Sequence, residues 1–204
     1  GKTLLSNTLN VLELFGIKQV VINVHYLGDQ IIDYIKKNKF NMTITIESEK
    51  DKILDTGGGI LNVIDHFSNE PFIVINPDTI WNSKYLNELQ IMEKEFLMNT
   101  KNKCFLLVVN KDKSFDQSLN GDFNLENNIL TRKDTDDLKY IYTGFQIIKP
   151  DVFDHSNLKV FSINKIWDDL IRNKVLFGKE SKNNFLHVST INIYENLLET
   201  RFKH

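Results

Sequence analysis

The segment from Ile17 to Val24 reads IKQVVINV, a β-branched run that is short enough for one buried strand. Gly28 and Asp29 begin a helical pattern after it, and Met42 to Glu47 (MTITIE) then alternates apolar and polar residues as a half-buried strand does. A strand, a helix and a second strand with short connections form the βαβ unit of a parallel sheet. This stretch therefore predicts an α/β fold, in which ligands bind beyond the carboxyl ends of the strands.

The same alternation of strand and helix extends on both sides of this unit. The other elements expected in the first half are a helix that ends at Gly16, buried strands at Pro71 to Asn76 and Cys104 to Val109, and a helix from about Ser83. The second half changes character, because its β-rich runs are separated by Asn- and Asp-rich turns, which are typical of antiparallel strands. These runs are Gly121 to Leu125, Ile129 to Arg132 and Tyr140 to Lys149.

The chain closes with three further expected elements. An amphipathic helix carries Ile163, Trp167 and Leu170 on one face, a short strand covers Phe185 to Val188, and Thr190 caps a last helix. No linker or repeat interrupts the pattern. We therefore expect one domain over residues 1–204, built on a mixed, mainly parallel sheet with a small antiparallel extension.

The composition excludes several classes of function. The 204 residues are 41% hydrophobic and carry a net charge of −2, which excludes wholesale disorder and leaves no basic excess for nucleic acid or an anionic membrane surface. No apolar stretch approaches the roughly 18 residues of a membrane span. The single Cys104 lies beside the apolar run Phe105 to Val109, which indicates a buried, unreactive thiol. We expect a soluble cytoplasmic protein without nucleic-acid or membrane partners.

The most unusual local feature is the run Thr56-Gly57-Gly58-Gly59 at the expected start of a helix. Three consecutive glycines expose backbone N–H groups and allow a nucleotide base or a phosphate to approach closely. The alternative is a tight turn that needs a positive φ angle, for which one or two glycines would suffice. The run matches neither G-x-G-x-x-G nor a P-loop, so neither hydride transfer nor ATP hydrolysis is indicated.

Asp78 directly follows the buried strand Pro71 to Asn76, and its carboxylate projects from the carboxyl edge of the sheet. A carboxylate there can hold Mg²⁺ against substrate phosphates, because Mg²⁺ takes one or two protein oxygens together with phosphate oxygens and water. The alternative for a Pro-Asp pair before a helix is an Asx turn or a helix cap. A lone His on a strand, as His187 is here, is more often a hydrogen-bonded structural residue than a metal ligand.

Several ordered motifs occur along nearly the whole chain. They are GKTLL (Gly1 to Leu5), VINVHYL (Val21 to Leu27), LDTGGGI (Leu54 to Ile60), INPD (Ile75 to Asp78), GDF (Gly121 to Phe123), YTGF (Tyr142 to Phe145), FSINKIWD (Phe161 to Asp168) and LHVST (Leu186 to Thr190). In this order they resemble the sugar-1-phosphate nucleotidyltransferase family, and most of all its N-acetylmuramate α-1-phosphate uridylyltransferase and mannose-1-phosphate guanylyltransferase-like members. The resemblance implies a Rossmann-like, three-layer nucleotidyltransferase fold of GT-A-like type.

The resemblance also implies a reaction. A nucleoside monophosphate is transferred from an NTP, either UTP or GTP, to a sugar 1-phosphate, which releases pyrophosphate and gives a nucleotide-sugar for cell-wall or glycan metabolism. The implied cofactor is Mg²⁺, with Mn²⁺ as a second candidate, held by Asp78 and His187; imidazole suits softer metals better than Mg²⁺. The implied nucleotide-binding residues are Glu49, Asp55, Thr56, Gly57, Gly58, Gly59 and Asn76, and the implied sugar-phosphate-binding residues are Gly144, Asn164 and Lys165.

The family's glycine-rich loop, and the central strand before it, lie upstream of the first of these motifs. We therefore expect an N-terminally truncated enzyme whose 204 residues have little or no activity. The alternative is a catalytically inactive nucleotide-binding or assembly domain of the same fold, whereas an unrelated redox domain would need a glycine-rich first turn that this sequence lacks. The sequence leaves the base, the sugar and the oligomeric state open.

Overall fold

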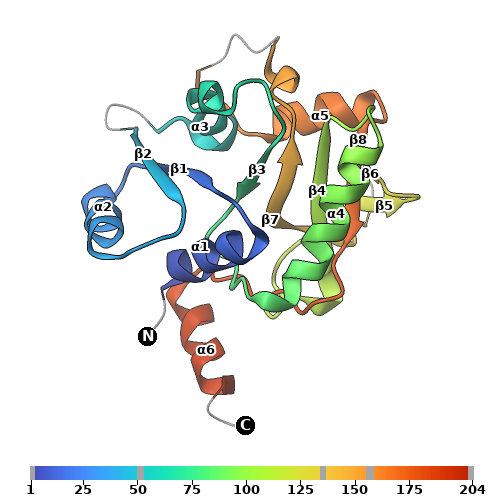
Figure 1. The fold of residues 1–204 in the computed structure, drawn as a ribbon. Helices are drawn as coiled ribbons and strands as arrows, with labels where there is room; N and C mark the ends of the chain where they lie inside the picture. Colours follow the sequence, from blue (N-terminus) through green and yellow to red (C-terminus); the bar gives the residue numbers. More distant parts are fainter. Residues whose placement is uncertain (1–2, 50–52, 134–136, 155–158, 202–204) are drawn as a thin grey trace.

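The computed structural model describes residues 3–49, 53–133, 137–154 and 159–201 (Figure 1). Its strands form two sheets, one of two strands and one of six. The strands are β1 (Gln19–Val24), β2 (Thr43–Ser48), β3 (Phe72–Ile75), β4 (Cys104–Asn110), β5 (Asn124–Glu126), β6 (Ile129–Thr131), β7 (Tyr140–Ile148) and β8 (Leu176–Glu180). The helices are α1 (Leu4–Phe15), α2 (Gly28–Lys37), α3 (Asp55–Asn62), α4 (Leu86–Met98), α5 (Asn164–Arg172) and α6 (Ile191–Arg201).

The first helix begins and ends where the sequence predicts. The side chain of Thr3 accepts a hydrogen bond from the backbone N–H of Ser6, which caps the first turn of α1. Gly16 ends the helix in the left-handed conformation, with a φ angle of 98° that favours glycine. The prediction of Gly16 as the helix stop is confirmed.

The six-stranded sheet has the order β3-β7-β4-β8-β6-β5 and is mixed. β4 and β8 are parallel, whereas β7 is antiparallel to both β3 and β4. The predicted α/β fold with a mixed sheet is therefore confirmed. The expectation of a mainly parallel sheet is wrong for the described strands, because β1–β2 and β4–β8 are their parallel pairs and the other pairs are antiparallel. The position of β7 differs from the expectation, because this strand lies between β3 and β4 rather than in a peripheral antiparallel extension.

Three layers follow from the way in which β4 distributes its side chains. Cys104, Leu106 and Val108 face an apolar cluster that includes residues of α3 and α5. Phe105 and Leu107 face the opposite cluster, which includes residues of α4. Figure 1 shows α4 and α5 on opposite faces of this sheet, as expected for the three-layer fold.

The small sheet is joined to the large one by side chains rather than by a strand ladder. β1 and β2 pair in parallel from Gln19 with Thr43 to Val24 with Ser48. An apolar cluster built on Leu9, Leu12 and Met42 contacts β1 as well as Ile73 and Ile75 of β3. In the described part of the chain, β1 and β3 therefore each pair along one edge only.

The thiol of Cys104 is fully buried, which agrees with the sequence prediction. It contacts the side-chain oxygen of Gln146 at 3.3 Å, and the indole N–H of Trp167 donates to the same oxygen at 3.0 Å. Burial raises the pKa of the Cys104 thiol far above its usual value.

We expect no reaction of the native protein with a thiol reagent and one reacting thiol per chain after denaturation. Fast labelling of the native protein would contradict this burial.

The last part of the chain is less regular than expected. The prediction of a strand at Phe185 to Val188 is wrong, because this segment forms only isolated bridges, between His187 and Thr79 and between Phe185 and Ser114. It is held in an extended form by backbone hydrogen bonds to residues on both sides. None of the described helices is long and apolar enough to cross a membrane.

Candidate functional site

The glycine run lies inside α3, and two of its backbone N–H groups donate hydrogen bonds within the protein rather than facing a ligand. The N–H groups of Gly57 and Gly58 donate to the carbonyl oxygen of Phe161 at 2.9 and 3.0 Å. The hydroxyl of Thr56 accepts from the N–H of Ile163 at 3.0 Å, and Asp55 accepts from the N–H of Thr56. These bonds attach the first turn of α3 to the segment that leads into α5.

The glycines are required for close packing rather than for a turn. Among the described residues the glycines with positive φ are Gly16 and Gly144, so the tight-turn explanation of the run is wrong. A Cβ atom on Gly57 would lie 2.5 Å from the Phe161 ring, and one on Gly58 would lie 2.4 Å from the Lys159 carbonyl oxygen. Both positions therefore exclude any side chain.

Gly59, in contrast, belongs to a polar cluster at the carboxyl ends of β1 and β2. The side-chain amide of Asn23 donates to Glu49 Oε1 at 2.8 Å and to the carbonyl oxygen of Gly59 at 2.9 Å. Glu49 Oε2 accepts from the N–H of Leu54 at 3.2 Å. The family resemblance implied a nucleotide site at Glu49 and Gly59 but not at Asn23, whose only signal is its position near the end of the predicted strand Ile17 to Val24.

Asn76 and Gly144 lie side by side where β3 ends. The N–H of Asn76 donates to the Gly144 carbonyl oxygen at 2.7 Å, and the indole N–H of Trp81 donates to the Asn76 carbonyl oxygen at 2.8 Å. Gly144 has a φ angle of 92°, and a Cβ atom there would lie 2.9 Å from Asn76 Cβ. Glycine is therefore required at position 144 by both conformation and space.

Asp78 and His187 form an ion pair beyond the end of β3. His187 Nε2 lies 3.1 Å from Asp78 Oδ2, and the two side chains are 22% and 45% exposed. A backbone hydrogen bond holds the two segments together, since the N–H of Val188 donates to the Asp78 carbonyl oxygen at 2.8 Å. The sequence considered both residues as metal ligands but gave no sign that they contact each other.

The environment of His187 favours its charged form. The hydrogen bond with Asp78 raises the pKa of His187 above its usual value against the opposing effect of burial, and the charge of Asp116 adds to the increase. His187 stacks on Phe185, and its Nδ1 is buried without a hydrogen-bond partner in the described part of the chain. A protonated imidazole donates hydrogen bonds and cannot bind a metal ion.

This raised pKa predicts a pH dependence of stability. A folded-state pKa above the unfolded value gives stabilisation that is complete below the unfolded pKa and is lost as the pH rises through the folded pKa. The native protein should therefore exceed His187→Gln in melting temperature most at about pH 5, with the difference shrinking toward about pH 9. Thermal unfolding monitored by circular dichroism measures both proteins, and a difference independent of pH would contradict the charged pair.

The two expected sugar-phosphate residues at the start of α5 differ in their surroundings. Asn164 Oδ1 accepts from Arg132 Nη1 at 2.9 Å, and Arg132 Nε donates to Asp168 Oδ1 at 2.9 Å. The guanidinium also lies over the Phe123 ring, 5.4 Å from its centroid. Both residues are exposed, and Asn164 is in addition held by its contact with Arg132.

Asp122 is a further polar residue to which the sequence gave no role. Its Oδ2 accepts from the N–H of Tyr142 at 2.8 Å, and burial raises its pKa. The buried hydroxyl of Tyr142 has no hydrogen-bond partner among the described residues. Burial, followed by the nearby Cys104, Asp78 and Asp122, raises the pKa of Tyr142. Asp122 and Asp78 thus both lie close enough to Tyr142 to influence its hydroxyl.

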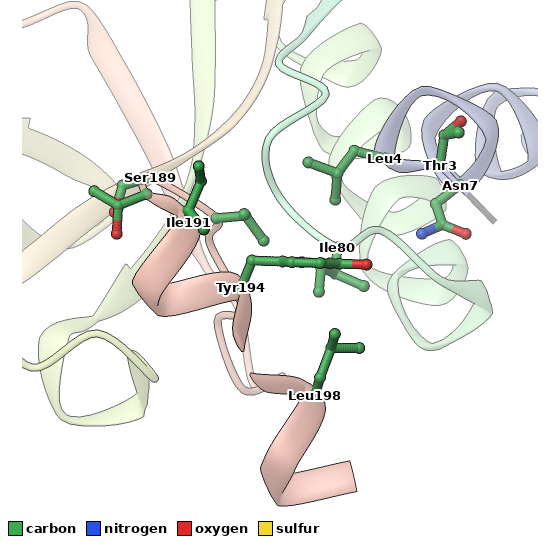
Figure 2. Close-up of a pocket in the computed structure, with 10 residues that line it drawn as sticks. Thr3, Leu4, Asn7, Ile80, Ser189, Ile191, Tyr194 and Leu198 are labelled. Carbon is green, nitrogen blue, oxygen red and sulfur yellow. The ribbon is translucent and has the colours of Figure 1, made fainter. Parts of the chain in front are cut away.

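A cavity of about 710 Å³ lies between α6 and the beginning of α1 (Figure 2). Ile80 and Val188 line it, and each follows closely after Asp78 or His187 in the chain. Its other lining residues come from the beginning of α1, from α6 and from the two residues before α6, and are Thr3, Leu4, Asn7, Ser189, Thr190, Ile191, Tyr194 and Leu198. No residue predicted for substrate or metal binding lines this cavity.

The described residues contain no group of three or more His, Cys, Asp or Glu side chains that could hold a metal ion by themselves. Mg²⁺ does not need such a group when phosphate oxygens and water complete its coordination. The half-exposed carboxylate of Asp78 meets this smaller requirement. The donor set therefore fits an ion that arrives with a phosphate ligand.

Comparisons with known proteins agree with this geometry. No protein-family model matches the chain. The N-acetylmuramate α-1-phosphate uridylyltransferase of Caulobacter vibrioides is 25% identical over 193 residues, which cover 92% of this chain and 79% of that protein. The expected resemblance is confirmed. This chain resembles the sugar-1-phosphate nucleotidyltransferases.

Solved structures extend the resemblance to the fold. A putative glucose-1-phosphate thymidylyltransferase from Bacillus anthracis, in complex with a sucrose, has a TM-score of 0.77 at 17% identity, over 97% of this chain and 81% of that one. HddC from Yersinia pseudotuberculosis, complexed with GMP-PN, has a TM-score of 0.74 at 20% identity, over 98% and 86% of the two chains. The chain thus has the fold of a sugar-1-phosphate nucleotidyltransferase over nearly its whole length.

Proposed function

We propose that this chain forms the substrate-binding body of a sugar-1-phosphate nucleotidyltransferase, which transfers a nucleoside monophosphate from UTP or GTP to a sugar 1-phosphate. The observation that carries the proposal is the half-exposed carboxylate of Asp78 beyond the end of β3, held by His187 at 3.1 Å. This is where an α/β sheet binds its ligands. The sequence similarity to a uridylyltransferase supports the same reaction.

The proposed reaction requires the two phosphates to be positioned, and it does not require a general base. An oxygen of the sugar 1-phosphate is already anionic, and it attacks the α-phosphorus of the NTP. The new P–O bond forms as the bond to the β-phosphate oxygen breaks, so that pyrophosphate leaves with that electron pair. The protein must align the two phosphates in line and stabilise the charge that develops.

In this proposal Asp78 holds Mg²⁺ or Mn²⁺, and His187 orients the Asp78 carboxylate by a hydrogen bond. When bound at Asp78, the ion would supply positive charge that neutralises the phosphates of the nucleotide. The contact of His187 Nε2 with Asp78 Oδ2 at 3.1 Å supports a role as hydrogen-bond partner of Asp78. The cluster of Asn23, Glu49 and Gly59 is the proposed place of the nucleotide base.

A second candidate is a module that binds nucleotide without turnover. It is favoured by the surroundings of Asp78, whose ionic partner in the described part of the chain is His187, with no Lys or Arg in an ion pair to it. Phosphoryl transfer relies on cationic side chains or metal to stabilise charge on the phosphates. A chain without those cations can bind a metal–nucleotide complex and still fail to react.

Titration calorimetry with UTP and GTP, each with Mg²⁺ and each with EDTA, tests the proposal. Metal-dependent binding of a nucleotide, followed by pyrophosphate release when a sugar 1-phosphate is added, is the expected result for the enzyme. Binding without pyrophosphate release supports the module instead. If neither nucleotide binds in the presence of Mg²⁺, both candidates are wrong for this chain.

A further inference from the structure

The chain segment that carries His187 lies between two other segments without a strand ladder. It forms isolated bridges to each of them. Two residues before His187, the N–H of Phe185 donates to the Lys113 carbonyl oxygen at 2.9 Å, and the N–H of Phe115 donates to the Phe185 carbonyl oxygen at 2.9 Å. The position of the His187 side chain therefore depends on what holds the chain after Phe185.

The imidazole of His187 is hydrogen-bonded at one of its two nitrogens. Its Nε2 lies 3.1 Å from Asp78 Oδ2, whereas its buried Nδ1 has no hydrogen-bond partner among the residues that the structure describes. A bond at the second nitrogen would otherwise help to fix a histidine ring. The ring stacks on Phe185, with the centroids 5.6 Å apart, but stacking allows a ring to slide within its own plane. The main chain must therefore set the distance between Nε2 and Asp78.

Asp116 contacts this main chain beyond His187. Its side chain is buried, and its Oδ1 accepts from the N–H and the hydroxyl of Ser118 at 3.0 and 2.6 Å. Its Oδ2 accepts from the hydroxyl of Ser189 at 3.4 Å, and Ser189 lies two residues after His187. The carboxylate is thus held by its own segment and reaches across to the segment of His187.

The contacts before and after His187 come from one short stretch of chain, residues 113–118. This stretch holds Phe185 by backbone hydrogen bonds and Ser189 by the Asp116 carboxylate. The negative charge of Asp116 also acts on the imidazole of His187. Without the second contact, the chain after Phe185 would be held on the Asp78 side alone.

We infer that Asp116 is a positioning residue for the pair of Asp78 and His187. It holds Ser189 and, through the main chain, keeps the His187 imidazole in place against the Asp78 carboxylate. This inference rests on the proposed function, in which Asp78 holds the metal ion. Asp116 acts through these residues and contacts neither the ion nor the nucleotide.

Proton NMR of the ligand-free protein at a fixed pH tests the positioning, because the Phe185 ring shifts the signals of the stacked His187 ring protons. His187→Gln identifies these signals by their loss. Ser189→Ala removes the donor to Asp116 and leaves its charge unchanged, so the His187 signals should move toward those of an unstacked histidine. Unchanged His187 signals in Ser189→Ala would overturn the inference.

The internal control in the same spectra is His66, which contacts Glu47 Oε1 at 3.0 Å in a separate pair. Its signals should stay in place in Ser189→Ala. If the His66 and His187 signals moved together, the hydroxyl of Ser189 would have a general structural role, and the inference would be overturned.

Calorimetry with UTP and GTP in the presence of Mg²⁺ tests the consequence for binding. Asp116→Asn keeps the shape of the side chain but has one acceptor oxygen, which cannot serve both Ser118 and Ser189. Its affinity should fall about tenfold, the lower value for one hydrogen bond to a charged group. The matched control is Asp112→Asn, an exposed carboxylate in the same part of the chain, which should bind as the native protein does.

The outcomes separate this inference from the proposed function. Native affinity in Asp116→Asn would overturn the inference and leave Asp78 as the proposed metal ligand. If the native protein binds neither UTP nor GTP with Mg²⁺, the proposed function fails, and the NMR result decides by itself whether Asp116 positions the imidazole.

Discussion

Asp78→Asn is expected to abolish Mg²⁺-dependent nucleotide binding while the protein remains folded. The substitution keeps the shape of the side chain and an oxygen that can face His187, but it removes the negative charge that attracts the ion. A charged ligand is worth more than the 1.5–3 kcal/mol of one hydrogen bond to a charged group, so the affinity should fall by about 100-fold or more. Calorimetry with and without EDTA measures the loss, and circular dichroism checks the fold.

The matched control is Asp151→Asn. The Asp151 carboxylate is also half-exposed and ion-paired, 3.1 Å from Lys103 Nζ. It follows the carboxyl end of β7, which is antiparallel to β3, so it lies at the opposite edge of the sheet from Asp78. The control should bind nucleotide as the native protein does. Equal Mg²⁺-dependent affinity of Asp78→Asn and the native protein would remove Asp78 from the site.

The elements that the sequence predicted correctly are those with a local signal. A few consecutive residues are enough to indicate the β-branched runs of β1 and β3 and the end of α1 at Gly16. The position of β7 was not predictable in this way. Which strands pair with β7 depends on packing across the whole sheet, and these strands are β3 and β4. The segment Phe185 to Val188 has the pattern of a strand but only isolated bridges.

The contacts between the predicted site residues could not be predicted from the sequence. Asp78 could be singled out because it lies just past the end of a predicted strand, and Glu49 because the family resemblance implies a nucleotide site there. Their partners, His187 and Asn23, come from distant parts of the chain, and nothing local indicates which side chain meets which. The pairing depends on the tertiary fold.

The glycine run of α3 gives the prediction with the largest expected effect on stability. Gly58→Ala would place a Cβ atom 2.4 Å from the Lys159 carbonyl oxygen and 3.1 Å from Leu54 Cβ. Backbone atoms cannot move aside as the end of a side chain can, so we expect a loss of about 1–3 kcal/mol in the free energy of unfolding. In an open helix the same substitution stabilises by about 1 kcal/mol, so the sign of the change is diagnostic. Chemical denaturation measures it.

Gly59→Ala is the control within the same helix, because the two neighbouring glycines face different surroundings. A Cβ atom on Gly59 would meet Glu49 Oε1 at 3.0 Å, and this carboxylate is the end of a flexible side chain. The free energy of unfolding of Gly59→Ala should therefore stay within about 1 kcal/mol of the native value. Alanine loses less conformational entropy than glycine when the helix forms, and this gain offsets the close contact with Glu49. Nucleotide affinity should fall instead, because Glu49 must shift. If Gly58→Ala were as stable as Gly59→Ala, close packing against Lys159 would not be the reason for glycine at position 58.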